Sequence, residues 1–269
     1  QSRRLITVWS QVRVLVGPPA YDKPGDCPAF LLLDFFTGDS MKLSPRLSKV
    51  YEMLPRAECI ADIGTDHAYI PIHLSEENKA NRVIACDIHC GPAERALQNI
   101  EKYGFSDRIE VRVGSGLGPL KKGEADGIIA AGMGGLMIID VLKENPEKSH
   151  ALQWMVLQPQ NHAGDLRIWL AENGYRIVQE DLALESVQLY EMMMAVPGYM
   201  PPITALEAEM GILEKIKENK LFKEKLYNLI GKREFMLQRI SEDSPGPKNR
   251  DKRKQAAKEK AQLEEILWK

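Results

Sequence analysis

Short apolar runs alternate with helical patterns through most of this 269-residue chain. The apolar runs are 59–63, 82–87, 109–113, 127–131 and 155–158, and the helical patterns around them are 45–54, 70–78, 93–103, 136–144 and 164–173. Parallel strands need crossover connections, and a helix usually supplies them. The alternation therefore predicts a doubly wound α/β domain with a parallel sheet.

Two further strand-like runs, 176–184 and 190–196, follow closely enough to form an antiparallel pair. A nucleotide-binding dehydrogenase lacks such an ending. A parallel sheet with a terminal antiparallel pair is the arrangement of the Rossmann-like, seven-stranded methyltransferase fold. We therefore expect that fold over residues 41–197.

The two flanks differ from this middle part. Residues 1–40 contain several Pro-Gly breaks, and Met41 reads like a natural start, so we expect a non-native or weakly structured extension. Prolines at 197, 201 and 202 mark a second boundary. The helical sequence of 198–269 carries narrow apolar seams, which favour an antiparallel coiled-coil arm. A few helices packed on the main domain are the alternative.

Charge is unevenly distributed along the chain. The net charge is −2, yet residues 201–269 hold 16 Lys and Arg against 12 Asp and Glu. A basic end suits an anionic partner such as nucleic acid, although a solvated helical face explains the same counts. The sequence has no apolar run of membrane-spanning length, and its four cysteines show no secreted disulfide pattern or zinc-like ligand spacing. We expect a cytoplasmic protein that binds neither membrane nor metal.

The turn after the first strand, residues 60–71, carries the strongest functional signal. Asp62 and Gly64 have the D-x-G spacing with which methyltransferases that use S-adenosylmethionine begin their cofactor site, although the later glycines of the generic fingerprint are missing. Gly64 lets the backbone approach a ligand. Asp62 either fixes an amino group of the cofactor or only caps the turn.

The next two strand ends add further cofactor candidates, because ligands bind outside the carboxyl ends of parallel strands. Asp87, which precedes Ile88, can accept both ribose hydroxyls of an adenosine-containing cofactor, or cap the next helix. Gly114 and Ser115 follow the third strand. Many methyltransferases place an acid there, whereas Ser115 offers only a weaker, uncharged hydrogen bond.

The last two strand ends complete the set. Gly132 and Gly134 allow a tight turn against a flat ligand, and Met133 between them is soft enough to pack on adenine or sulfur. A close helix–strand crossing is the alternative explanation for these glycines. The loop after the fifth strand is either a substrate contact or an ordinary polar loop, and its candidate residues are Gln158, Pro159, Gln160 and Asn161.

Three strings at these strand ends resemble the bacterial tRNA adenine-22 N1-methyltransferases: ADIGTDHAYIP at 61–71, AGMGG at 131–135 and LQP at 157–159. The resemblance is close from Met41 to about Val196 and extends into the helical tail. It implies a Rossmann-like domain that transfers the methyl group of S-adenosyl-L-methionine to N1 of an adenine in tRNA, and a helical arm that grips tRNA. Two residues depart from the family pattern: Ser115 replaces an acid, and Gln160 stands where Asn is expected.

The chemistry implied by this resemblance assigns further roles. Adenine N1 attacks the methyl group directly, so orientation matters more than proton removal. Because the adduct is cationic, Asp66 is the candidate to stabilise it, and His67 and Tyr69 are candidates to orient or stack on the base. N1 lies on the pairing edge, so a paired adenine has to be exposed or flipped first.

Basic residues near the start of the last helix are candidates for phosphate contact, which predicts an affinity that falls steeply with salt. They are Lys248, Arg250, Lys252, Arg253, Lys254, Lys258 and Lys260. Two other functions stay open: a methyltransferase acting on a small molecule or protein, and a non-catalytic binder that uses the cofactor pocket structurally. We expect a monomer or weak dimer.

Overall fold

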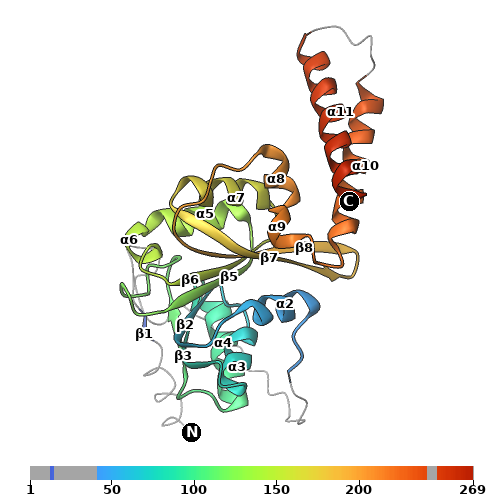
Figure 1. Cartoon of the computed structure of the whole chain (residues 1–269). Coiled ribbons are helices and arrows are strands. Elements are labelled where there is room, and N and C mark those ends of the chain that lie inside the picture. Colours follow the sequence, from blue (N-terminus) through green and yellow to red (C-terminus); the bar gives the residue numbers. More distant parts are fainter. Residues whose placement is uncertain (1–12, 15–40, 241–246, 269) are drawn as a thin grey trace.

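A mixed sheet flanked by helices forms the body of the protein, and a pair of helices projects from it (Figure 1). The computed structural model describes residues 13–14, 41–240 and 247–268. The strands are β1 (Arg13–Val14), β2 (Ala57–Ile63), β3 (Ala80–Asp87), β4 (Ile109–Val113), β5 (Gly127–Met133), β6 (Trp154–Pro159), β7 (Tyr175–Glu185) and β8 (Gln188–Pro197). Their order in the sheet is β1-β4-β3-β2-β5-β6-β8-β7.

The strand directions confirm the expected Rossmann-like methyltransferase fold. Strands β2 to β6 run parallel to their neighbours, whereas β8 pairs antiparallel with both β6 and β7. The sequence did not predict β1, a two-residue strand that pairs with the outer edge of β4. The rest of the expected N-terminal extension, residues 1–12 and 15–40, lies outside the described residues.

Helices cover both faces of the sheet and follow the expected alternation. They are α2 (Pro45–Met53), α3 (Tyr69–Glu76), α4 (Cys90–Tyr103), α5 (Gly135–Glu144), α6 (Pro146–Ser149), α7 (Ala163–Glu172), α8 (Ala205–Met210), α9 (Leu213–Ile216), α10 (Phe222–Arg239) and α11 (Pro247–Leu267). Elements expected in the catalytic region begin or end within three residues of their predicted bounds.

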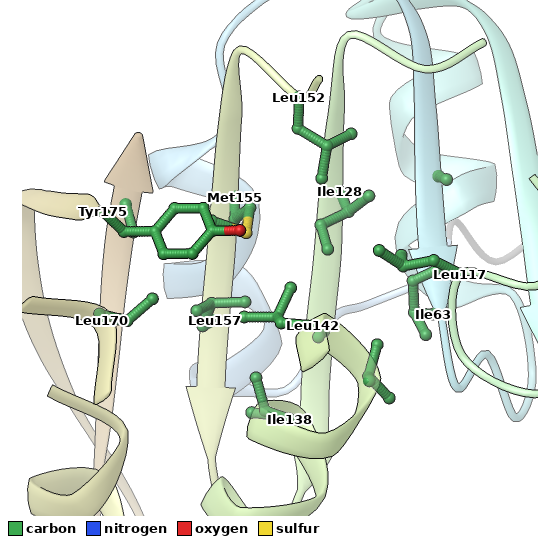
Figure 2. Close-up of a cluster of buried hydrophobic side chains, with 14 of the residues drawn as sticks. Ile63, Leu117, Ile128, Ile138, Leu142, Leu152, Met155, Leu157, Leu170 and Tyr175 are labelled. Atoms are coloured by element: carbon green, nitrogen blue, oxygen red, sulfur yellow. The ribbon is translucent and has the colours of Figure 1, made fainter. Parts of the chain in front are cut away.

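Two apolar cores account for the near-continuous apolar runs of the central strands. On one face, residues of α5 and α7 such as Leu142 and Leu170 pack against Ile128 and Leu157 (Figure 2). On the other face, α2, α3 and α4 pack against alternate residues of the same strands, among them Ile129. Strands that are buried on both faces need apolar residues at every position, which explains the runs in the sequence.

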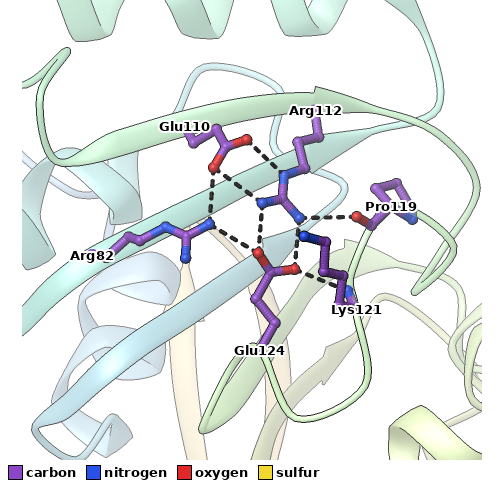
Figure 3. A network of polar contacts seen from close by, with 6 residues as sticks. All are labelled: Arg82, Glu110, Arg112, Pro119, Lys121 and Glu124. Atoms are coloured by element: carbon purple, nitrogen blue, oxygen red, sulfur yellow. Dashed lines mark hydrogen bonds and ion pairs between the residues drawn. The ribbon is translucent and has the colours of Figure 1, made fainter. Parts of the chain in front are cut away.

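An ion-pair network holds the loop that follows β4 (Figure 3). Arg112, which is buried on β4, pairs with Glu110 at 3.0 Å and with Glu124 at 2.7 Å, and its guanidinium also donates to the Pro119 carbonyl at 2.9 Å. Arg82 of β3 binds the same two carboxylates. Hydrogen bonds from Arg112 hold the pKa of Glu124 well below its ordinary value. The network thereby fixes residues 114–124, which begin at the strand end where Gly114 and Ser115 lie.

The C-terminal helices are attached to the sheet by a largely buried charge cluster. Arg167 of α7 pairs with Glu180 of β7 at 2.5 Å and with Glu191 of β8 at 2.6 Å, and Lys225 of α10 reaches Glu191 at 2.6 Å. Buried charges are stable only when they are paired, so this cluster ties the start of α10 to the body of the protein.

Both sequence-based ideas about the tail describe part of it. The short helices α8 and α9 pack against α7 and β7 respectively. Beyond them α10 and α11 lie side by side and project from the body (Figure 1). The division at residue 197 into a catalytic domain and a tRNA-binding arm stays a prediction.

Candidate active site

The cofactor candidates converge because their strands are parallel and in register. Ile63 pairs with Cys86, and Asp87 pairs with Val113, so β2, β3 and β4 end together. On the other side of β2, strand β5 ends at Met133, opposite Pro159 of β6. The strand-end residues predicted from the sequence therefore lie along one edge of the sheet.

The Gly64 turn has a backbone that only glycine adopts easily. Its φ is +81°, and the amides of Gly64 and Thr65 both donate to the Cys86 carbonyl, at 2.8 and 2.9 Å. A Cβ at Gly64 would lie 2.7 Å from Cε of Met133. Ala68, at the start of α3, also has a positive φ of 55°. The end of the Met133 side chain thus lies against the turn after β2, and a side chain at position 64 would displace it.

Asp62 is a buried carboxylate for which the described residues supply no ion-pair partner. Its exposed fraction is 8%, and burial raises its pKa to about 6, with a contribution in the same direction from Asp87. The Thr65 hydroxyl opposes this rise, yet its oxygen is buried and makes no well-formed hydrogen bond within the described structure. A bound cationic amino group would satisfy the carboxylate, and the hydroxyl would gain a partner.

The structure shows one of the two roles considered for Asp87, the support of the following helix. Its Oδ1 accepts a hydrogen bond from the His89 amide at 2.8 Å, which supports the start of α4, and burial raises the pKa of its carboxyl group. The following residue, Ile88, is 57% exposed. An exposed apolar side chain beside this carboxylate suits the edge of a nucleoside.

The β4 end is joined to the β3 end and is followed by an exposed serine. The Gly114 amide donates to the Asp87 carbonyl at 2.9 Å, which joins the two strand ends. Ser115 is exposed, and its hydroxyl lies 3.4 Å from a Glu144 carboxylate oxygen. Glu144 lies 29 positions away on α5. It places a carboxylate beside Ser115, where the sequence itself offers no acid.

The three residues predicted to face the substrate form one cluster. His67 and Tyr69 stack with centroids 5.1 Å apart and ring planes at 11°, and Nε2 of His67 lies 3.2 Å from Asp66. Arg95 of α4, which the sequence analysis missed, forms an ion pair with Asp66. Asn99 of the same helix donates to the His67 carbonyl at 2.9 Å. Asp66 therefore has a cationic partner before any substrate binds.

The candidate substrate residues at the ends of β5 and β6 differ in their exposure to solvent. Gln158 is fully buried, and both polar atoms of its side-chain amide form hydrogen bonds within the protein. Its Oε1 accepts from the Arg46 guanidinium at 2.6 Å and from the Gly132 backbone amide at 3.1 Å. Its Nε2 donates to the Pro159 carbonyl at 2.9 Å. Gln160 and Asn161 are exposed at the strand end. An ideal Cβ on Gly134 would lie 3.1 Å from the Asn161 amide oxygen. The structure gives Gln160 and Asn161, but not Gln158, free access to a base.

The basic candidates lie on the projecting arm rather than at the strand ends (Figure 1). Lys252 and Lys254 are exposed on α11. The guanidinium of Arg253 instead donates to the carbonyls of Leu237 and Ile240, both at 2.6 Å, where α10 ends. Arg253 thus joins the two helices of the arm.

Features elsewhere in the described structure do not compete with this edge. A shallow hollow at the opposite, amino edge of the sheet is lined by Arg56, Lys79, Asp126 and Trp154 among others, and contains none of the candidates. Within residues 13–14, 41–240 and 247–268, no group of three His, Cys, Asp or Glu side chains could hold a metal ion. No helix among them is long and apolar enough to cross a membrane.

Comparisons with known proteins agree with this geometry. The family described as "Methyltransferase domain" matches residues 43–193. The tRNA (adenine(22)-N(1))-methyltransferase of Bacillus subtilis (strain 168) is 34% identical over 85% of this chain and 98% of its own length. The crystal structure of the Bacillus subtilis tRNA methyltransferase TrmK has a TM-score of 0.74 and 33% identity, covering 85% of this chain and all of that one.

A second solved structure bears on the cofactor. Mycoplasma capricolum TrmK, in complex with the cofactor product S-adenosylhomocysteine, has a TM-score of 0.72 and 28% identity, covering 83% of this chain and 99% of that one. The residues here fit such a cofactor, because the edge offers a buried unpaired carboxylate at Asp62, an unpartnered hydroxyl at Thr65 and a side-chain-free turn at Gly64.

Substitution of Gly64 tests whether the covered turn holds the cofactor. Gly64→Ala places a methyl group against Met133, and we expect the affinity for S-adenosylmethionine to fall at least about tenfold in a calorimetric titration. Gly104→Ala is the matched control, because Gly104 has a similar φ of +78° but open space around its Cβ position. It should lose about 1 kcal/mol of stability and no cofactor affinity. Equal affinities of the two variants would contradict the assignment.

The buried carboxylate of Asp62 should lower the stability of the cofactor-free protein at neutral pH while it favours binding of the cofactor. Because the pKa of Asp62 rises from 3.8 to about 6 on folding, the folded state binds this proton more tightly, and the contribution of Asp62 to stability falls as pH rises from about 4 to 6. This shift corresponds to about 3 kcal/mol. In urea unfolding without cofactor, Asp62→Asn should be the more stable protein at pH 7.5, with little difference at pH 4.

The same variant should bind S-adenosylmethionine more weakly than the wild type, because the neutral amide cannot balance the amino group's charge. A variant that matches the wild type in stability at both pH values and in cofactor affinity would show that Asp62 only caps the turn.

Proposed function

Because this chain belongs to the family of tRNA (adenine(22)-N(1))-methyltransferases, we propose that it transfers a methyl group from S-adenosylmethionine to N1 of adenine 22 in tRNA. The observation that carries the proposal is the buried Asp62 beside the side-chain-free Gly64 turn, at the sheet edge where Asp87 also ends its strand. The site thus has groups for an amino group, for a ribose and for close backbone approach.

Each candidate cofactor residue contacts a different part of S-adenosylmethionine. Asp62 holds the amino group of the methionine part, Asp87 accepts the ribose hydroxyls, and Gly114 with Ser115 borders the adenine. Gly132, Met133 and Gly134 line the opposite side, where Met133 packs over the Gly64 turn. When bound, S-adenosylmethionine supplies an electrophilic methyl group on a sulfonium.

The substrate residues have to orient the target base rather than remove a proton. The N1 lone pair forms the new bond to carbon while the carbon–sulfur bond breaks, and the electron pair of that bond stays on sulfur. Holding N1 and the methyl carbon about 3–3.5 Å apart and in line supplies much of the acceleration. The exposed amides of Gln160 and Asn161 bind the base edge, and the stacked His67 and Tyr69 offer an aromatic surface.

Asp66 stabilises the positive charge that develops on the adenine. Its carboxylate is already paired with Arg95, so the two cationic groups compete for it. The tRNA backbone provides a competing anion for the Arg95 guanidinium. If a phosphate takes up Arg95, the Asp66 carboxylate is released toward the base. This arrangement makes the full negative charge of Asp66 available only when substrate is present.

The projecting arm binds the tRNA backbone. Lys252 and Lys254 are exposed on α11 and donate to phosphates, whereas Arg253 keeps α10 and α11 together. Position 22 lies within folded tRNA, so a contact at a distance from the reacting base helps to place it. We also propose a cytoplasmic location, as this substrate requires, and a monomer or weak dimer.

Incubation with labelled S-adenosylmethionine and unmodified tRNA, followed by mapping of the labelled nucleotide, tests the proposal. We expect the label at N1 of adenine 22. Label on a small molecule or protein alone would favour the alternative substrate class. Cofactor binding without any transfer would favour a non-catalytic binder.

Two variants in the same assay separate the roles of the loop and the arm. Asp66→Ala should lower kcat by about 100-fold while cofactor affinity stays unchanged, because it removes a charge that acts on the cationic product. Lys252→Ala combined with Lys254→Ala should raise KM for tRNA and reduce its salt dependence while kcat stays unchanged. Unchanged transfer by the Asp66 variant would remove that residue from the mechanism.

A further inference from the structure

A chain of contacts leads from the first helix of the described catalytic region to the cofactor turn. It begins at Arg46 in the first turn of α2, whose Nη1 donates to Oε1 of Gln158 at 2.6 Å. Arg46 and Gln158 are 112 positions apart in the sequence. Since Gln158 is completely buried, the guanidinium reaches into the space behind the β5–β6 strand ends.

Gln158 in turn holds a bulge at the end of β5. The pairing register of β5 with β6 shifts between Ala131 and Met133, which leaves the Gly132 amide without a strand partner. That amide donates to Oε1 of Gln158 at 3.1 Å, the same oxygen that Arg46 binds. A bulge re-aims the residue beside it. Here that residue is Met133.

Met133 completes the chain, because its Cε lies 2.7 Å from the position that a Cβ on Gly64 would take. The orientation of the Gly132–Gly134 turn therefore decides how closely Met133 covers the cofactor turn. The second anchor of this region is the Gln160 amide, which donates to the Met133 carbonyl at 2.9 Å.

Arg46 itself is held from two sides. Its backbone amide donates to a Glu185 carboxylate oxygen at 3.2 Å, and its guanidinium lies 5.5 Å from the centre of the Tyr190 ring. Glu185 ends β7 and Tyr190 belongs to β8. The antiparallel strand pair that distinguishes this fold thereby fixes the arginine.

We propose that Arg46 is a positioning residue for methyl transfer, acting through Gln158 on the bulge that aims Met133 at the cofactor turn. Within the described structure, the hydrogen bonds that Arg46 donates go to Gln158 and Glu185 rather than to Gly64 or Met133, so its effect is on geometry at the reacting centre. This inference rests on the proposed tRNA methylation. A displacement of about 1 Å at such a centre can cost about 100-fold in rate.

Single-turnover methyl transfer to unmodified tRNA by the full chain is the first test. Arg46→Ala should lower the rate constant by about 10- to 100-fold, with cofactor Kd and KM for tRNA within about threefold of the wild type. Arg46→Lys retains one donor and should recover part of the rate. Lys49→Ala is the matched control: it removes the same charge from the same helix, but Lys49 pairs with Glu52 and Asp181 instead.

The pair is tested by combining substitutions. Arg46→Ala and Gln158→Leu act on one contact chain, so the double variant should be no slower than the slower single variant. Additive losses, a rate for Arg46→Ala equal to that of Lys49→Ala, or a loss confined to KM for tRNA would each overturn the positioning role.

Amide hydrogen exchange gives an answer that does not depend on activity. In Arg46→Ala, the Gly132 amide within the peptide 130–136 should exchange at least about tenfold faster than in Lys49→Ala, because Arg46 no longer holds Oε1 of Gln158, the acceptor of that amide, in place. A wild-type protein that transfers no methyl group to tRNA would refute the proposed function alone. Equal exchange in the two variants would refute the role of Arg46 in either case.

Discussion

The parallel register of β2 to β6 is the constraint on which the rest of the structure depends. It places the ends of these strands at one edge, so residues that are scattered from Asp62 to Asn161 share a site. Apolar cores on both faces hold that register, and the same burial keeps Asp62 out of water and raises the pKa of its carboxyl group. The packing that stabilises the sheet therefore also keeps the Asp62 carboxylate buried and without an ion-pair partner among the described residues, which suits a cationic ligand.

The sequence was sufficient for most of the fold because the informative signals are local. Strands that are buried on both faces read as apolar runs, and Gly64 and Gly114 directly follow two of them. The two-residue strand β1 has too few positions to show a period, so it escaped prediction. The attachment of the tail was also invisible, because Arg167, Glu180 and Lys225 become partners only in the folded protein.

The site was predictable to the same extent. Asp62, Gly64 and Asp87 could be placed because each lies within one residue of a strand end, where a ligand site of a parallel sheet is expected. Partners from other elements could not be placed, since no pattern links Arg95 to Asp66 or Arg46 to Gln158. For the same reason, the internal hydrogen bonds of polar side chains such as Gln158 and Arg253 could not be predicted from the sequence.

A crystal structure of this protein with S-adenosylmethionine bound would test most directly whether the cofactor lies at this edge of the sheet. We expect the methionine amino group at Asp62, the ribose hydroxyls at Asp87, and backbone contact at Gly64 beneath Met133. A ligand that lies elsewhere on the sheet, or that leaves Asp62 without a cationic partner, would contradict this expectation.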